Sequence, residues 1–246
     1  MKMADLIHMN YLLLPVISRF GIQLGFGDQS IQEVCSKHDV NEDFFIEIIN
    51  AFHDEDYCLQ QDLQQFSIQL IIDYLHKTHQ WYLEKKVPEI ETHMQEMVEG
   101  CYLQKDNMTL LNSFFQKYKT ELILHIENEE DVVYPYIQEV DRVLKQRKIR
   151  SDFSIKMKKY SIRNFLIEHD DMEEKLFDLK NILIKYLPPP KNSSLCNHLI
   201  SELFKLEKDL NDHSRIEEKI LVPKVIAMEE EVKKLSLQRS ICHFND

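Results

Sequence analysis

The stretch HIENEEDVVYP at residues 125–135 decides the fold, because it returns as HSRIEEKILVP at residues 213–223. Both copies have the pattern His-x3-Glu-Glu-x4-Pro. Side chains four residues apart lie on one face of an α-helix, about 6 Å from each other. The histidine and the first glutamate of each copy therefore share a helix face: His125 with Glu129, and His213 with Glu217.

Both of these faces are otherwise apolar. In each segment apolar residues recur at steps of three and four, which is the spacing of one buried helix face. They are Leu111, Phe115, Tyr118, Leu122, Val132 and Tyr136 in one segment, and Leu199, Leu203, Leu206, Leu210 and Ile220 in the other. A third stripe passes through His169 along Ile162, Phe165, Met172, Leu176, Leu179 and Leu183. Polar side chains therefore occupy core positions in three predicted helices.

Composition excludes several classes of protein. The 246 residues include only 4 glycines and 7 prolines, too few for the turns of a many-stranded sheet. The formal charge of −12 argues against nucleic acid and anionic membranes as partners. The five cysteines lie far apart without a Cys-x-x-Cys pair, as is typical of free thiols in a reducing compartment. No stretch approaches the roughly 18 apolar residues of a membrane span, so we expect a cytoplasmic protein.

Helix signals divide the chain into two parts. Residues 1–58 hold three of the four glycines and short apolar stretches, which predicts a small helical N-terminal domain. Its helices are capped by Asp28 or Ser30 and by Asn41. Residues 66–240 contain four long segments with helical periodicity, at about 67–100, 106–145, 151–188 and 193–237. Short connections between four such helices predict an all-α protein with an up-down-up-down four-helix bundle.

Each repeated motif also has a histidine about one helical hairpin upstream. His76 or His79 precedes His125, and His169 precedes His213. Four helices would thus direct four imidazoles and two carboxylates into the core. Buried carboxylates are costly unless a positive charge compensates them, and imidazole with carboxylate suits first-row transition metals. We therefore expect two metal ions bridged by Glu129 and Glu217. The alternative is a helical interaction protein without metal.

Further polar residues flank these positions. His76 and His79 are three residues apart, so one is expected to be a ligand and the other to lie behind it. Glu121 is one turn before His125, and Glu168 adjoins His169; both are candidates for hydrogen bonds to ligands or for a proton path. Glu130 is expected to point about 100° away from the buried stripe, toward solvent.

The motifs resemble those of the haemerythrin-like HHE cation-binding domain in the di-iron proteins of iron–sulfur cluster repair, over essentially the whole chain. This resemblance implies a haemerythrin-like bundle with a non-haem centre of two iron ions. It also implies the ligands, and it alone selects His76 over His79. The implied ligands are His76, His125, Glu129, His169, His213 and Glu217.

The N-terminal segment Arg19-Phe20-Gly21-Ile22, followed by the stretch at 30–35, is similar to the small helical domain of that family. Family members usually carry an adjacent Cys-Cys pair shortly after this segment. Here Gly25-Phe26 stands in its place, so a thiol-dependent role of the domain is not expected.

The resemblance implies a function in the nitrosative and oxidative stress response, in which damaged iron–sulfur clusters are repaired by iron donation or by handling of nitric oxide. The expected partners are a diatomic ligand, O2 or NO, and iron–sulfur apoproteins. One alternative is a module that binds or senses O2 or NO without repair. Another is an enzyme that reduces NO or peroxide.

Overall fold

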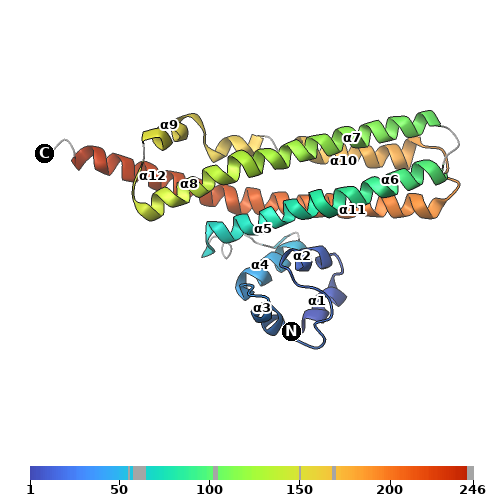
Figure 1. Ribbon diagram of the computed structural model, residues 1–246, viewed down its shortest axis with the longest axis horizontal. Helices are drawn as coiled ribbons and strands as arrows, with labels where there is room; N and C mark the ends of the chain where they lie inside the picture. The colour runs from blue at the N-terminus through green and yellow to red at the C-terminus, as the bar shows by residue number, and fades with distance from the viewer. Residues whose placement is uncertain (55, 58–64, 102–104, 150, 168–169, 243–246) are drawn as a thin grey trace.

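Four long helical rods run antiparallel in the computed structural model, which describes residues 1–246 except 55, 58–64, 102–104, 150, 168–169 and 243–246 (Figure 1). The rods are α5 (Ile68–Trp81) continuing into α6 (Val87–Cys101), α7 (Lys105–Asn128) into α8 (Tyr134–Gln146), α10 (Asp170–Asn181), and α11 (Ser193–Ile216) into α12 (Val222–Cys242). The predicted all-helical bundle with up-down-up-down topology is confirmed.

Four short helices precede the bundle: α1 (Met3–Met9), α2 (Leu13–Arg19), α3 (Ile31–Lys37) and α4 (Glu42–His53). Ser30 and Asn41 cap α3 and α4 by accepting hydrogen bonds from backbone N–H groups of the first turn, as predicted. The short helices pack beside α5 and α11 (Figure 1).

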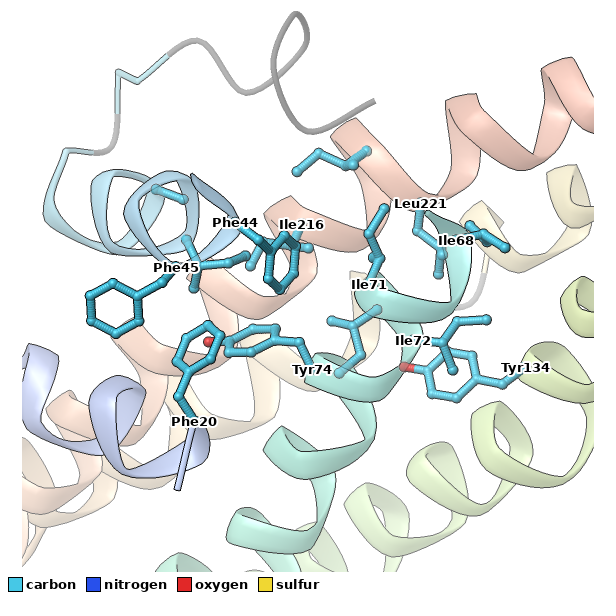
Figure 2. Packing of buried hydrophobic residues seen from close by; sticks show 14 of the residues in the cluster. Phe20, Phe44, Phe45, Ile68, Ile71, Ile72, Tyr74, Tyr134, Ile216 and Leu221 are labelled. Carbon is cyan, nitrogen blue, oxygen red and sulfur yellow. The ribbon is translucent and has the colours of Figure 1, made fainter. Parts of the chain in front are cut away.

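Aromatic side chains join these short helices to the bundle. Phe20, which ends α2, lies 5.0 Å from Phe45 of α4 and 5.2 Å from Tyr74 of α5, measured between ring centroids. Figure 2 shows these rings together with Ile216 and Leu221 of the C-terminal rod. The N-terminal helices and the adjacent half of the bundle therefore share one apolar core.

The third predicted helix, at 151–188, is not continuous. The chain instead forms α9 (Ser151–Lys159), the 3-10 helix η4 (Ile162–Ile167) and then α10. Buried Glu229 of α12 accepts hydrogen bonds from the backbone N–H of Ile162 and the hydroxyls of Tyr136 and Ser161. Because the Ile162 N–H is held by this carboxylate, it cannot donate to the carbonyl four residues before it, and the helix ends.

Each rod contains one turn of π-helix. These turns are η2 (Tyr82–Lys86), η3 (Glu129–Val133), η5 (Ile182–Tyr186) and η6 (Glu217–Leu221). Each begins six residues before a proline: Pro88, Pro135, Pro188 and Pro223. A proline lacks the N–H that an α-helix requires, and its ring clashes with the carbonyl four residues earlier. The N–H just before each proline donates instead to the carbonyl five residues back, so the chain passes each proline in a wider turn.

The π-turns shift the buried stripe by one residue. Val132 was expected on the stripe, yet its side chain is 45% exposed, whereas Val133 is fully buried. Residues five apart lie on different faces of an α-helix. Across the π-turn, Glu129 and Tyr134 both face the core.

Candidate metal centre

A layer of polar side chains separates two apolar cores in the bundle. One core contains the N-terminal helices and the adjacent ends of the rods, and the other lies among α6, α7, α10 and the first part of α11. The layer contains His79, Glu129, His213 and Glu217, which are all buried. One nitrogen or oxygen atom from each of the four lies within 4.8 Å of the others. The bundle therefore has a buried His/Glu metal site.

His79 lies at the centre of this cluster. Its Nε2 atom is 3.0 Å from Glu129 Oε2 and 3.2 Å from His213 Nε2. His125 approaches the other oxygen of Glu129, with its Nε2 atom 3.0 Å from Oε1. His213 Nε2 lies 3.4 Å from Glu217 Oε1. Three imidazoles and two carboxylates thus converge on one region.

The π-turns place the acidic ligands and their neighbours. Glu129 and Glu217 each occupy the first position of a π-turn. Tyr134, immediately after η3, donates its hydroxyl to Glu217 Oε1 at 3.0 Å, and its ring stacks on that of His79. Burial and the adjacent Glu217 carboxylate raise the pKa of Tyr134 well above its ordinary value. Tyr134 therefore stays a hydrogen-bond donor to Glu217.

The buried carboxylates of the layer favour positive charge on the neighbouring imidazoles. Burial alone would lower the pKa of His79, but hydrogen bonds to Glu129 and Glu130 outweigh it and raise this pKa to about 9. The pKa of His125 is also raised, because its bond to Glu129 outweighs burial. Burial acts to raise the pKa of Glu129, but the two imidazoles hold it below its ordinary range. The carboxylates around His79 therefore favour positive charge at this position of the layer.

His76, preferred over His79 from the resemblance, lies outside the buried cluster. Its side chain is 48% exposed, and its Nδ1 atom is 2.8 Å from Glu130 Oε2. His79 Nδ1 is 2.7 Å from the other oxygen of the same carboxylate. Glu130 was expected to point toward solvent. Its carboxylate instead contacts both histidines. The π-turn that begins at Glu129 turns through a smaller angle per residue than an α-helix, which brings Glu130 toward His79.

The remaining predicted residues lie elsewhere or are not described. Glu121 is partly buried and forms an ion pair with Lys175 of α10, 3.0 Å away, rather than contacting a ligand. His169 and Glu168 lie outside the described residues. Whether His169 completes the site stays a prediction.

A small cavity of about 30 Å3 adjoins the cluster. Its walls combine ligand side chains with apolar residues. Among them are His79, His125, Glu129 and His213, with Leu122, Ile126 and Leu176. A cavity of this size holds about one or two water-sized molecules. The side chain of His125 is 21% exposed, the largest exposure among the three clustered histidines.

The N-terminal helices reach this layer through a buried ion pair that sequence reasoning missed. Arg19 of α2 donates to Asp209 Oδ2, and its guanidinium lies over the Trp81 ring at 4.6 Å. Asp209 Oδ1 accepts a hydrogen bond from Tyr82 at 3.2 Å, and the Tyr82 ring packs edge-on against His213. The sequence feature that could have revealed this ion pair is the position of Asp209, an acidic residue one turn before His213 in an apolar segment.

None of the helices in the described part of the chain combines the length and the hydropathy of a membrane span.

Comparison with known proteins gives two findings. The family described as "Hemerythrin HHE cation binding domain" matches residues 70–225, which contain the whole of the cluster. The chain is also similar to the iron-sulfur cluster repair protein YtfE of Salmonella typhimurium and of Salmonella dublin. Each is 22% identical over 206 residues, which cover 82% of this chain and 86% of the relative.

Proposed function

The chain belongs to the haemerythrin HHE cation-binding domain family, and from this premise we propose that it is a non-haem di-iron protein that helps restore damaged iron–sulfur clusters under nitrosative or oxidative stress. The buried His/Glu cluster supports the di-iron centre. The similarity to named repair proteins, which extends over both parts of the chain, supports the biological role.

The side chains in the layer fit a pair of iron ions. The facing nitrogens of His79 and His213 are 3.2 Å apart, close to the separation of two imidazoles bound to one ion through bonds of about 2.1 Å. Glu129 lies between His79 and His125, and each of its two oxygens faces one of these imidazoles. His79, His125, His213, Glu129 and Glu217 would hold the ions. Bound iron would supply redox chemistry and coordination positions open to a small ligand.

The surrounding residues keep these donors in place. A carboxylate at Nδ1 of a histidine fixes its tautomer and directs Nε2 toward a cation. Glu130 has this position at His79. Tyr134 holds one oxygen of Glu217, and apolar residues on both sides of the layer limit access of water.

Iron donation from this centre would not use a thiol pair in the N-terminal helices. Gly25-Phe26 stands where the family's Cys-Cys pair is expected. Cys35 of α3 is buried, and burial raises the pKa of its thiol to about 11, which makes it a poor nucleophile and ligand at neutral pH. We infer that iron would leave as cargo at the more exposed His125 side of the cluster.

Reversible binding of O2 or NO is the second candidate function. The small cavity beside His125 and Glu129 favours it, because its volume matches a diatomic molecule and its walls include Leu122, Ile126 and Leu176. A reversible spectral change with O2 or NO, without transfer of iron and without turnover, would support this candidate over repair. Steady consumption of NO or peroxide with a reductant would instead indicate an enzyme.

Metal analysis tests the di-iron centre. We expect about two iron ions per chain after anaerobic reconstitution, and loss of both in the isosteric Glu129→Gln Glu217→Gln variant. The variant Glu127→Gln Glu218→Gln removes the same charge from the same helices and should keep its iron. Fewer than one iron per chain in the unsubstituted protein would overturn the di-iron proposal.

Iron transfer tests the repair role separately. The loaded protein is mixed with an apoprotein that has lost its iron–sulfur cluster, together with a sulfide source and a reductant. We expect cluster absorbance to return with the unsubstituted protein and not with Glu129→Gln Glu217→Gln. A fully loaded protein that restores no more cluster than buffer does would contradict repair while leaving the di-iron centre intact.

A further inference from the structure

A second pair of histidines faces each other across the same two rods, far from the buried cluster. His93 of α6 and His198 of α11 approach with their Nε2 atoms 3.1 Å apart, and their rings meet edge to face at a centroid distance of 4.4 Å. We propose that His93 and His198 form a separate surface site for a divalent transition-metal cation that favours imidazole, such as Zn2+, Cu2+ or Ni2+.

The distance between the nitrogens fits a shared cation. Two imidazole nitrogens bound to one tetrahedral ion through bonds of about 2.0–2.1 Å lie roughly 3.3 Å apart. The observed 3.1 Å is close to this value, and it matches the 3.2 Å between His79 and His213 in the buried layer. A cation could therefore enter between His93 and His198 with little movement of either helix.

Glu96 orients one of the two ligands. Its Oε2 atom is 3.2 Å from Nδ1 of His93, on the opposite side of the ring from His198. A carboxylate that accepts the Nδ1 proton leaves the lone pair on Nε2, which is the arrangement found behind metal-bound histidines. Without a cation, this lone pair can accept a hydrogen bond from Nε2–H of His198. With a cation bound, both Nε2 atoms would be donors to the metal.

The surrounding charge favours a cation. Besides Glu96, Glu89 lies one turn before His93 and Glu202 one turn after His198. Lys86 binds both of these carboxylates and Lys205 also binds Glu202, so the two lysines offset two of the three negative charges and leave one in excess. His198 is exposed and the side chain of His93 is 21% exposed, so water can supply the remaining ligands.

The surface pair cannot share an ion with the buried cluster. Fourteen residues separate His79 from His93, and fifteen separate His198 from His213. At about 1.5 Å per helical residue, the two pairs are about 20 Å apart along the rods. A cation at the surface pair would link α6 to α11 in the half of the bundle that lies away from the N-terminal helices.

Calorimetric titration of the full-length, iron-loaded protein with Zn2+ tests the site. We expect His93→Ala and His198→Ala each to lose one Zn2+ equivalent or to bind it at least about tenfold more weakly. Substituting a residue that only supports a metal ligand already weakens metal affinity about tenfold, so loss of a ligand should cost at least as much. Glu96→Gln should weaken Zn2+ binding by a smaller factor than either histidine substitution, because Glu96 supports a ligand and does not itself bind the cation. His8→Ala, at an exposed histidine of α1, is the matched control and should leave the titration unchanged.

The melting temperature gives a second readout. Because a cation that binds only the folded protein stabilises it, Zn2+ should raise the melting temperature of the unsubstituted protein more than that of either histidine variant. His198 is exposed and His93 is partly buried, outside both apolar cores, so both variants are expected to fold. Equal Zn2+ stoichiometry and affinity in the unsubstituted protein, His93→Ala and His198→Ala would overturn the proposal.

Discussion

At the scale of single residues, the imidazole of His79 is held at both nitrogens, whereas that of His76 lies near the surface. Nε2 of His79 meets Glu129 and His213, and Nδ1 meets Glu130. His76 shares only Glu130 with this group. The two histidines therefore differ in burial and in access to the proposed iron ligands.

Substitution of these two histidines should separate their roles. We expect His79→Ala to lose at least one iron ion per chain and His76→Ala to retain both, because only His79 reaches the buried carboxylates. Iron content after identical reconstitution and desalting is the measurement. Equal loss in the two variants would mean that the exposed His76 turns inward to bind metal.

The protonation of His79 gives a second prediction. In the metal-free protein, nuclear magnetic resonance should detect a histidine that titrates near pH 9 and disappears in His79→Gln but not in His76→Gln. Below this pH the imidazole is charged, and its charge balances Glu129. The variant Glu129→Gln removes the main stabilising partner, so burial should then move the pKa of His79 downward. A His79 that titrates near 6.5 in the unsubstituted protein would contradict the proposed charge balance.

The sequence predicted part of the cluster for a clear reason. His125 with Glu129 and His213 with Glu217 are four residues apart within single helical segments, so local geometry alone places each pair on one face. The choice between His76 and His79 depends on how α5 rotates against α8 and α11, which is a tertiary property. Glu130 was placed incorrectly because the prediction assumed an uninterrupted α-helix.

At the scale of helices, the prolines control which side chains reach the core. Pro135 cannot continue the α-helical hydrogen-bond ladder, and the resulting π-turn η3 directs both Glu129 and Tyr134 inward. The sequence revealed the position of this irregularity through the repeated proline. The sequence did not reveal which irregularity forms, because a kink, a break or a wider turn can each accommodate a proline in a helix.

Replacement of Pro135 tests the role of the π-turn. In Pro135→Ala the restored N–H can donate to the carbonyl of Asp131, which favours a regular α-helix. We expect a higher melting temperature for the metal-free protein together with weaker metal binding, because Glu129 and Tyr134 would no longer face the same side. Pro135 is exposed, so no core packing is lost. Unchanged metal affinity would show that packing, not the proline, maintains the turn.

The break in the third predicted helix has a different origin. No proline or glycine occurs between Ser151 and Ile167, and the apolar stripe runs through the segment. The interruption comes from Glu229, which is about 70 residues further along the chain and captures the N–H of Ile162. A contact of this range leaves no local pattern, so sequence periodicity could not predict it.

At the scale of the whole molecule, one buried ion pair connects the N-terminal helices to the bundle. The side chain of Arg19 is fully buried against Asp209, Trp81 and Tyr82. Removing one member of a buried pair leaves an uncompensated charge, whereas replacing both with apolar residues often costs little. The pair therefore favours one arrangement of the two parts of the chain.

A double-mutant cycle measures this connection. We expect Asp209→Leu and Arg19→Met each to lower the free energy of unfolding by about 3–5 kcal/mol, and the double variant to recover most of the loss. Chemical denaturation is the measurement, and Lys2→Met Asp28→Leu, at an exposed pair, is the control. Additive losses in the double variant would show that the two side chains act independently.

The polar layer also has a consequence for how the protein can release a metal ion. The layer interrupts the apolar interior, so the continuous helical rods and a bound cation would connect the two cores across it. Among the described residues, the core joined to the N-terminal helices is the larger one, so the opposite half is expected to be the weaker unit. Local opening of that half would expose the ligands to solvent while the rest of the chain stays folded, so an ion could be exchanged without global unfolding.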